Sequence, residues 1–152
     1  MGPFVFSRPI EIRFGDTDAM GHVNNATYLT YLEAGRAGYF KAVTGRGFEE
    51  TLRDAVSIVL ANVRLDYRAP AFFGEELELA CRTTWVSRSS FGMEYRLTAA
   101  ADSPHGPGRL IADGDSVQVF YDPQAQRPTR LPADFLRRIE AFEGRPIPPR
   151  PA

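Results

Sequence analysis

The sequence has almost no cysteine: Cys81 is the only one among 152 residues. One thiol cannot form a disulfide within the chain, and it excludes zinc and iron–sulfur sites built from several cysteines. This cysteine content suits a reducing compartment, so we expect a cytoplasmic protein.

Long apolar runs are also lacking, since none approaches the roughly 20 residues that cross a bilayer. Pro3 and Arg8 also interrupt the N-terminal stretch, so we expect neither a signal peptide nor a membrane partner.

An excess of charge of one sign is also lacking. Lys and Arg number 18 against 19 Asp and Glu, which gives a formal net charge of -1 and a sequence pI near 6.1. Proteins that bind nucleic acid through its phosphate backbone usually carry a basic surplus. We therefore expect no nucleic-acid partner.

What is present is the composition of a globular domain. Hydrophobic residues make up 43% of the chain and aromatic residues 12%. A chain of this length can bury roughly 70% of its unfolded surface. We expect one domain over residues 1–143. The segment 144–152 is rich in proline, and we expect it to be extended or disordered.

One segment has the periodicity of a long helix. Asn24 and Asn25 offer side-chain oxygens for its N-cap. The helix is predicted to run to about Val43, with Gly45 at the C-terminal cap position. Glycine and alanine are frequent within it, which favours close packing against other backbone. We expect a central helix whose buried face is formed by Tyr28, Tyr31, Leu32, Gly35 and Tyr39.

Most of the remaining chain alternates as strands do. In residues 76–87, Leu77, Leu79 and Cys81 alternate with more polar neighbours, which is typical of an antiparallel strand with one packed face. A strand, one long helix and then several strands is the order of an α+β domain in which an antiparallel sheet wraps the helix. The predicted strands span 4–14, 57–68, 76–87, 91–101 and 109–121, and a short helix is predicted from Pro132 to Phe142. Open sheet edges predict a homo-oligomer, a dimer or a tetramer.

The densest cluster of functional groups lies in residues 13–36, RFGDTDAMGHVNNATYLTYLEAGR, which join a strand end to the predicted helix start. A helix N-terminus presents unpaired N–H groups and a partial positive charge, which suit it to stabilise an oxyanion. A carboxylate a few residues earlier can attack a carbonyl or activate water. Asp16 and Asp18 are the candidates.

The same residues also have structural, non-catalytic interpretations. An Asp-x-Asp pair before a helix often supplies turn and cap hydrogen bonds, and His22 has the position of an ordinary loop histidine. Glu33 and Arg36 have the spacing of an ion pair on one helix face. A metal site of Asp16, Asp18 and His22 offers too few ligand types, so no metal is expected.

Residues 12–36, IRFGDTDAMGHVNNATYLTYLEAGR, closely resemble the motif of hotdog-fold acyl-CoA thioesterases, in the 4-hydroxybenzoyl-CoA thioesterase-like group. Two later segments, YRAPAFFGEEL (67–77) and SRSSF (87–91), are similar to further parts of that family. The resemblance covers about residues 8–121. It implies the hotdog fold, hydrolysis of an acyl-CoA to the free acid and CoA, and a pocket between subunits.

The resemblance also implies roles for individual residues. The catalytic carboxylate falls on Asp18, which acts as nucleophile or as general base, and Asp16 falls on a structural position. The oxyanion donor, a backbone N–H in the first turn of the helix, falls on or beside Asn25. Residues around the helix start indicate an aliphatic or other acyl group rather than benzoyl. The expected substrate-binding residues are His22, Val23, Asn24, Tyr28, Glu33, Arg88, Ser89 and Ser90, the last three near the CoA phosphates.

The sequence contains no nucleotide-binding glycine loop and no G-x-S-x-G elbow, so a serine-triad mechanism is excluded. A thioester is already activated, so no cofactor is expected. Two rival hypotheses remain open. A hotdog hydratase or dehydratase would place a histidine on the central helix, and the predicted helix holds none. A non-catalytic acyl-CoA-binding protein would keep the pocket without needing Asp18.

Overall fold

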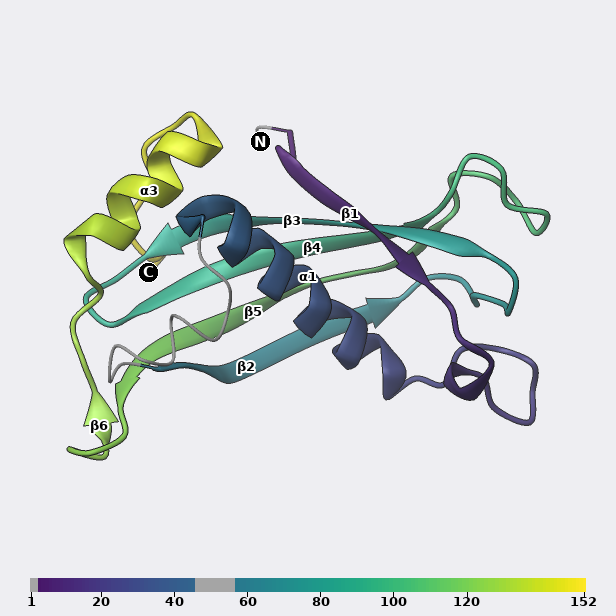
Figure 1. The fold of residues 1–152 in the computed structure, drawn as a ribbon, viewed down its shortest axis with the longest axis horizontal. Helices are drawn as coiled ribbons and strands as arrows, with labels where there is room; N and C mark the ends of the chain where they lie inside the picture. The colour runs from purple at the N-terminus through teal and green to yellow at the C-terminus, as the bar shows by residue number, and fades with distance from the viewer. Residues whose placement is uncertain (1–2, 46–56) are drawn as a thin grey trace.

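The structure is a computed structural model that describes residues 3–45 and 57–152. An antiparallel sheet lies against one long helix, α1 (Thr27–Thr44), as Figure 1 shows. The strands are β1 (Phe6–Glu11), β2 (Ser57–Tyr67), β3 (Glu76–Val86), β4 (Ser90–Ala99), β5 (Leu110–Asp122) and the short β6 (Arg127–Pro128). A 3-10 turn, η1 (Phe14–Asp16), and a second helix, α3 (Ala133–Glu143), complete the described elements. This is the α+β architecture that the sequence predicts, an antiparallel sheet against one long central helix.

The strand order is β1-β3-β4-β5-β2, with β6 paired to β5. Strands β3, β4 and β5 form a meander, whereas β2 crosses over to become an edge, although it precedes β3 in the chain. Each residue of β2 whose side chain is described is exposed or half-buried, including Leu60 and Tyr67. This edge therefore offers backbone hydrogen-bonding groups and apolar side chains to a neighbour.

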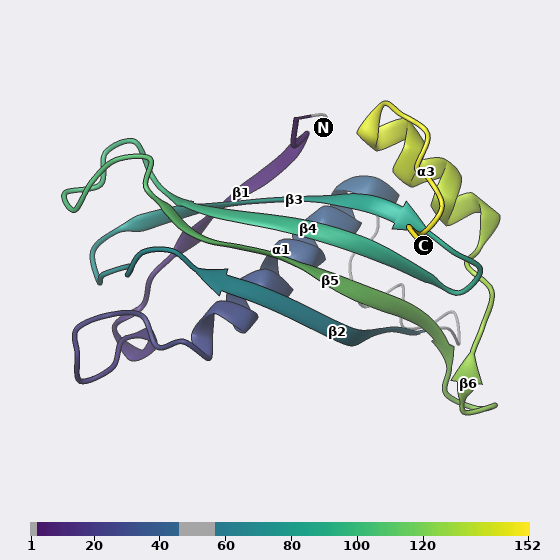
Figure 2. The same ribbon diagram turned by 180° about the vertical axis from the view of Figure 1, so that it is seen from behind.

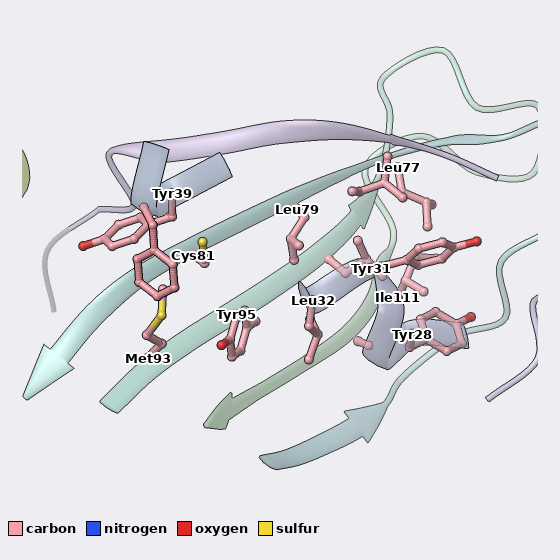
Figure 3. Close-up of a cluster of buried hydrophobic side chains, with 14 of the residues drawn as sticks. Tyr28, Tyr31, Leu32, Tyr39, Leu77, Leu79, Cys81, Met93, Tyr95 and Ile111 are labelled. Atoms are coloured by element: carbon pink, nitrogen blue, oxygen red, sulfur yellow. The ribbon is translucent and has the colours of Figure 1, made fainter. Parts of the chain in front are cut away.

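The core lies between α1 and the inner face of the sheet (Figure 3). Gly35 permits the close approach predicted from the sequence, because a Cβ atom there would lie 2.2 Å from Cδ2 of Leu79. The labelled side chains of this cluster include Tyr28, Tyr31, Leu32, Tyr39, Leu77, Leu79, Cys81 and Tyr95. Helix α1 packs chiefly on β1 and β3, which leaves the β2 side of the inner face less covered.

The outer face of the sheet is polar where β2 meets β5. In Figure 2 the strands lie in front of α1, and no described helix covers this face. Arg64 pairs with Asp115 at 3.0 Å, and Arg68 pairs with Asp113 at 2.8 Å. Since side chains alternate along β2, these charges face away from the core.

Two details differ from the predictions. The first strand was predicted to continue to Phe14, but β1 ends at Glu11 and the chain turns into η1, which leaves Phe14 77% exposed. The N-cap of α1 is Ala26, without a side-chain cap, so the prediction of an Asn24 or Asn25 cap is wrong. The Asn24 carboxamide oxygen instead accepts the Ala26 N–H at 2.9 Å and closes a turn before the helix.

The C-terminal segment is attached to the end of β3. Glu143 is buried and accepts hydrogen bonds from the Tyr39 hydroxyl at 2.6 Å and the Thr83 N–H at 3.2 Å. Beyond α3, the carbonyl of Pro148 accepts the Val86 N–H, and Arg150 donates back to Val86. Among the described helices, none has the length and apolar character needed to span a membrane.

Candidate active site

The turn before α1 is built around a buried carboxylate, Asp16, which is 3% exposed. Its Oδ2 accepts the Arg13 N–H at 3.0 Å and the Tyr31 hydroxyl at 2.8 Å, and its Oδ1 accepts the Arg13 guanidinium at 3.0 Å. Its backbone carbonyl accepts the Asn24 N–H at 2.8 Å. Asp16 thereby joins the end of β1, the turn and the helix.

Burial alone would raise the pKa of Asp16. The hydrogen bonds from Arg13 and Tyr31 outweigh that cost, so the pKa of Asp16 is lowered from its ordinary value. The same contact, together with burial, raises the pKa of Tyr31. Asp16 is therefore ionised at neutral pH with both oxygens in use, which fits the structural role inferred from the sequence.

Asp18 lies in a different setting, on the loop between Thr17 and Val23, which form a bridge. Its side chain is exposed, and Oδ1 accepts the Met20 N–H at 2.9 Å. Its backbone closes the loop, donating to the His22 carbonyl at 2.9 Å and accepting from Gly21 at 3.0 Å. Within residues 3–45 and 57–152 the second carboxylate oxygen of Asp18 has no hydrogen-bond partner, so it is left for other contacts.

The start of α1 presents a donor near this loop. Asn24 accepts the N–H groups of both Ala26 and Thr27, whereas the Asn25 N–H has no partner within the described residues. The Asn25 carbonyl accepts the Tyr67 hydroxyl at 2.9 Å, which fixes this turn against the end of β2. A free N–H beside a helix N-terminus is suited to bind a carbonyl oxygen that gains negative charge.

A cavity of about 270 Å³ opens beside Asn25. Val23 is held there by its N–H bond to the Ala71 carbonyl, and the His22 ring meets Phe72 edge to face at 5.3 Å. Burial raises the pKa of Tyr28, which packs against Tyr67 with ring centroids 5.3 Å apart. The lining residues are His22, Val23, Asn25, Tyr28, Tyr67, Arg68, Ala69 and Pro70.

The structure gathers one part of the predicted site and separates another. His22, Val23, Asn25 and Tyr28 line the cavity, whereas Asp18 and Asn24 adjoin it in the chain without lining it. Arg88 and Ser89 lie in the β3–β4 connection and Ser90 begins β4, at the opposite end of the sheet (Figure 1). The 11 residues of β3 separate the two ends by roughly 35 Å at the usual rise per residue. Within one chain, the two groups cannot contact the same reacting atom.

The separated residues have their own surroundings. Arg88 is exposed and borders a cavity of about 620 Å³ with Arg130 and the start of α3, while its carbonyl accepts the Leu131 N–H. Ser90 is buried and shares a 2.6 Å hydroxyl contact with Ser87. Glu33 is exposed on α1. Within the described residues it is not paired with Arg36, which donates to the Tyr95 hydroxyl at 3.3 Å.

Sequence analysis missed three residues of this region. Tyr31 was assigned only to the core, yet its hydroxyl fixes Asp16. Tyr67 and Arg68 line the cavity, and the segment 67–77 was noted only as a family resemblance. Across residues 3–45 and 57–152, no three His, Cys, Asp or Glu side chains converge as metal ligands would.

Comparison with known proteins gives consistent matches. The model of the thioesterase-like superfamily matches residues 12–139. A 1,4-dihydroxy-2-naphthoyl-CoA hydrolase of Synechococcus elongatus is 29% identical over 136 residues, which are 87% of this chain and 91% of that protein. Acyl-CoA thioester hydrolase YbgC of Escherichia coli is 25% identical over 142 residues, covering 92% and 99% of the two chains.

Solved structures agree with this match. A thioesterase of Thermus thermophilus, crystallised with coenzyme A and Zn, is 35% identical to this chain with a TM-score of 0.81. The match covers 97% of this chain and 100% of that one. The 4-hydroxybenzoyl-CoA thioesterase of a Pseudomonas species, 21% identical with a TM-score of 0.79, shares the fold.

Proposed function

The chain belongs to the thioesterase-like superfamily, and from that premise we propose that it hydrolyses the thioester of an acyl-CoA to the free acid and CoA. The observation that carries the proposal is the Asn25 N–H before the start of α1, which has no partner within the described residues and lies close in the chain to the exposed carboxylate of Asp18. Together they provide a donor for a developing oxyanion and a group that attacks or activates water.

In the proposed reaction the thioester carbonyl oxygen accepts the Asn25 N–H. Asp18 either attacks the carbonyl carbon, forming an anhydride that water then hydrolyses, or removes a proton from the attacking water. The partial positive charge of the α1 N-terminus stabilises the oxyanion in both routes. The carbon–sulfur bond breaks as the anhydride forms in the first route and as the tetrahedral intermediate collapses in the second. The CoA thiolate takes up a proton released by the attacking water, so CoA leaves as its thiol and the acyl group as the acid. Neither route needs a metal or an organic cofactor.

The site is completed, in this proposal, by a second copy of the chain. Asp18 is exposed, and no residue of β2 whose side chain is described is buried. The β3–β4 connection, which contains Arg88, lies at the other end of β3 from the Asp18 loop. A homodimer or a dimer of dimers that pairs through β2 would bring residues 57–68 and 87–91 of one copy to the 18–25 loop of the other. Sedimentation at micromolar concentration should therefore show a multiple of 16.9 kDa. A monomer would contradict this arrangement.

The function is tested by following thiol release from a panel of short, long and aromatic acyl-CoAs. We expect free CoA and free acid in equal amounts from at least one substrate. Binding without thiol release would support a non-catalytic acyl-CoA-binding protein. Addition of water to an unsaturated acyl group with the thioester intact would support a hydratase.

A further inference from the structure

A buried ion pair between Glu75 and Arg109 contacts a segment that lines the cavity beside Asn25, and the chemistry described above does not use it. The Glu75 side chain, directly before β3, is 0% exposed, and the Arg109 side chain, directly before β5, is 22% exposed. Oε1 of Glu75 accepts from Nη2 of Arg109 at 2.9 Å, and Oε2 accepts from Nη1 at 3.0 Å and from the Ser103 hydroxyl. Burial alone would raise the pKa of the Glu75 carboxyl, but the hydrogen bonds that it accepts, above all those from Arg109, lower it. Glu75 is therefore ionised at neutral pH and held at two points by the guanidinium.

The ion pair also holds backbone groups of segment 70–72. Nη2 of Arg109 donates to the Pro70 carbonyl at 2.9 Å, and Oε1 of Glu75 accepts the Phe72 N–H at 2.9 Å. This segment lies between the end of β2 and the start of β3, outside the ladders of the main sheet. Because the two side chains bind these backbone groups where no strand of that sheet does, they determine where the segment lies.

The same segment contacts the loop that carries the candidate catalytic groups. The Ala71 carbonyl accepts the Val23 N–H at 2.9 Å, and His22 forms an antiparallel bridge with Phe72. Val23 is bridged in turn to Thr17, the residue before the candidate catalytic carboxylate. Three short stretches of chain therefore lie side by side, and the outermost is the one that the ion pair holds. The proposed oxyanion donor follows Val23 by two residues.

We propose that Glu75 and Arg109 are positioning residues for thioester hydrolysis. By fixing segment 70–72, they set where the Asn25 N–H lies relative to the Asp18 carboxylate. The inference rests on the proposed thioesterase function. Among the described residues, neither member of the ion pair lines the cavity, so the effect passes through the backbone and not through contact with the substrate. A misplacement of about 1 Å can reduce a rate about 100-fold, since a donor must lie at hydrogen-bond distance from the oxyanion that forms.

A second ion pair with a buried arginine provides a matched control. Arg82 on β3 is 3% exposed and pairs with Glu94 on β4 at 2.8 Å. The two residues face each other inside the β3–β4 ladder. Arg82 lies about 20 Å along β3 from Glu76, the end of the strand nearest the cavity, at the usual rise per residue. Loss of this pair should reduce stability without displacing the 18–25 loop.

The activity test compares Glu75→Gln with Glu94→Gln, since each substitution keeps the size of the side chain and removes the charge opposite an arginine. With the best substrate of the acyl-CoA panel, we expect Glu75→Gln to lower kcat by about tenfold or more with KM nearly unchanged, and Glu94→Gln to leave kcat near the native value. A native kcat in Glu75→Gln, or an equal fall in both variants, overturns the proposal. If Glu75→Gln fails to fold, as judged by circular dichroism, Arg109→Lys takes its place, with Arg82→Lys as the matched control.

Amide hydrogen exchange separates failure of this inference from failure of the proposed function. The Val23 N–H is bonded to the Ala71 carbonyl, so its exchange reports whether that contact stays closed. Relative to the Tyr95 N–H at the centre of β4, we expect this exchange to be about tenfold faster in Glu75→Gln and unchanged in Glu94→Gln. Exchange that is the same in both variants overturns the inference even if hydrolysis is fast. Faster exchange in Glu75→Gln, in a protein that hydrolyses none of the panel, supports the link between the ion pair and the loop and contradicts only the proposed function.

Discussion

Asp16 and Asp18 are two residues apart in the chain and lie in opposite surroundings. Asp16 is buried, and its two oxygens accept three hydrogen bonds from Arg13 and Tyr31. Asp18 is exposed and accepts one, from its own loop. A carboxylate whose oxygens are all engaged stabilises a turn but has no free oxygen with which to attack. The same carboxylate side chain therefore stabilises the turn at position 16 and is available for chemistry at position 18.

The largest effect is expected from Asp18→Asn. The amide keeps the size of the side chain and its acceptor for the Met20 N–H, but it removes both nucleophile and base. We expect kcat to fall by about 100-fold or more, the range that a positioned acid–base group commonly supplies, with circular dichroism and assembly unchanged. Steady-state thiol release with the best substrate of the panel measures the change.

The matched control for Asp18→Asn is Asp16→Asn, and two outcomes of this pair of variants would contradict the assigned roles. If Asp18→Asn kept near-normal turnover while Asp16→Asn abolished it in a folded protein, the two roles would be exchanged. If both variants kept full activity, neither carboxylate would take part in the reaction.

The next largest effect is a loss of stability in Asp16→Asn. The variant removes the charge that receives the Arg13 and Tyr31 hydrogen bonds, and bonds to a charged group contribute about 1.5–3 kcal/mol. We expect the free energy of unfolding in urea to fall by roughly 2–3 kcal/mol, with activity of the folded fraction largely retained. Asp18→Asn is the control, since its exposed side chain should change unfolding by less than about 0.5 kcal/mol.

The lowered pKa of Asp16 adds a pH dependence with a defined sign. Because the folded pKa lies below the unfolded value of about 3.9, its stabilisation is complete above pH 3.9 and is lost as pH falls through the folded pKa. Urea unfolding of the native protein should therefore become easier below pH 3.9. The difference in stability between the native protein and Asp16→Asn should narrow over the same range. A difference that stays constant down to pH 2 would contradict the assignment.

Much of the fold was predictable because the patterns that specify it are local. A period of 3.6 identified α1, and alternation identified β2 to β5 within a few residues of their observed bounds. The edge position of β2 depends on which strands pair after a crossover, and no local pattern encodes that choice. The helix start was misplaced by up to two residues because Asn24 closes a turn instead of capping the helix.

The site was predictable only where residues adjacent in the chain are also adjacent in space. The 18–25 loop meets that condition, whereas Tyr31 reaches Asp16 from across 15 residues. Gln118 shows a different limit. Alternation by hydrophobicity would turn Val117 and Val119 inward, but both are half-buried and Gln118 is the buried residue. Positions where local rules fail in this way are commonly functional ones.

A smaller effect is expected from Tyr31→Phe, which removes one of the three hydrogen bonds to Asp16. The ring remains in the core, so the loss is limited to one bond to a charged acceptor, about 1–2 kcal/mol in the free energy of unfolding. The pKa of Asp16 should rise towards its ordinary value, so the acid-induced loss of stability should be smaller than in the native protein and should be complete at a higher pH. An NMR titration of the Asp16 carboxyl measures this. No change in that titration would show that Arg13 alone sets the pKa.

The smallest effect is expected from substitution of Arg88. Like the two aspartates, Arg13 and Arg88 carry the same charged group in different surroundings. Arg13 is fixed by Asp16, whereas the Arg88 guanidinium is exposed and has no partner within the described residues. If Arg88 meets a CoA phosphate of a substrate bound mainly by the other copy, Arg88→Ala should raise KM several-fold, about 1 kcal/mol, and leave kcat nearly unchanged. Added salt should weaken CoA binding to the native protein more than to the variant, because the lost interaction is screened by ions. Arg127→Ala, in β6, is the matched control for general loss of positive charge. An equal and small change in both variants would show that Arg88 is only a solvated side chain.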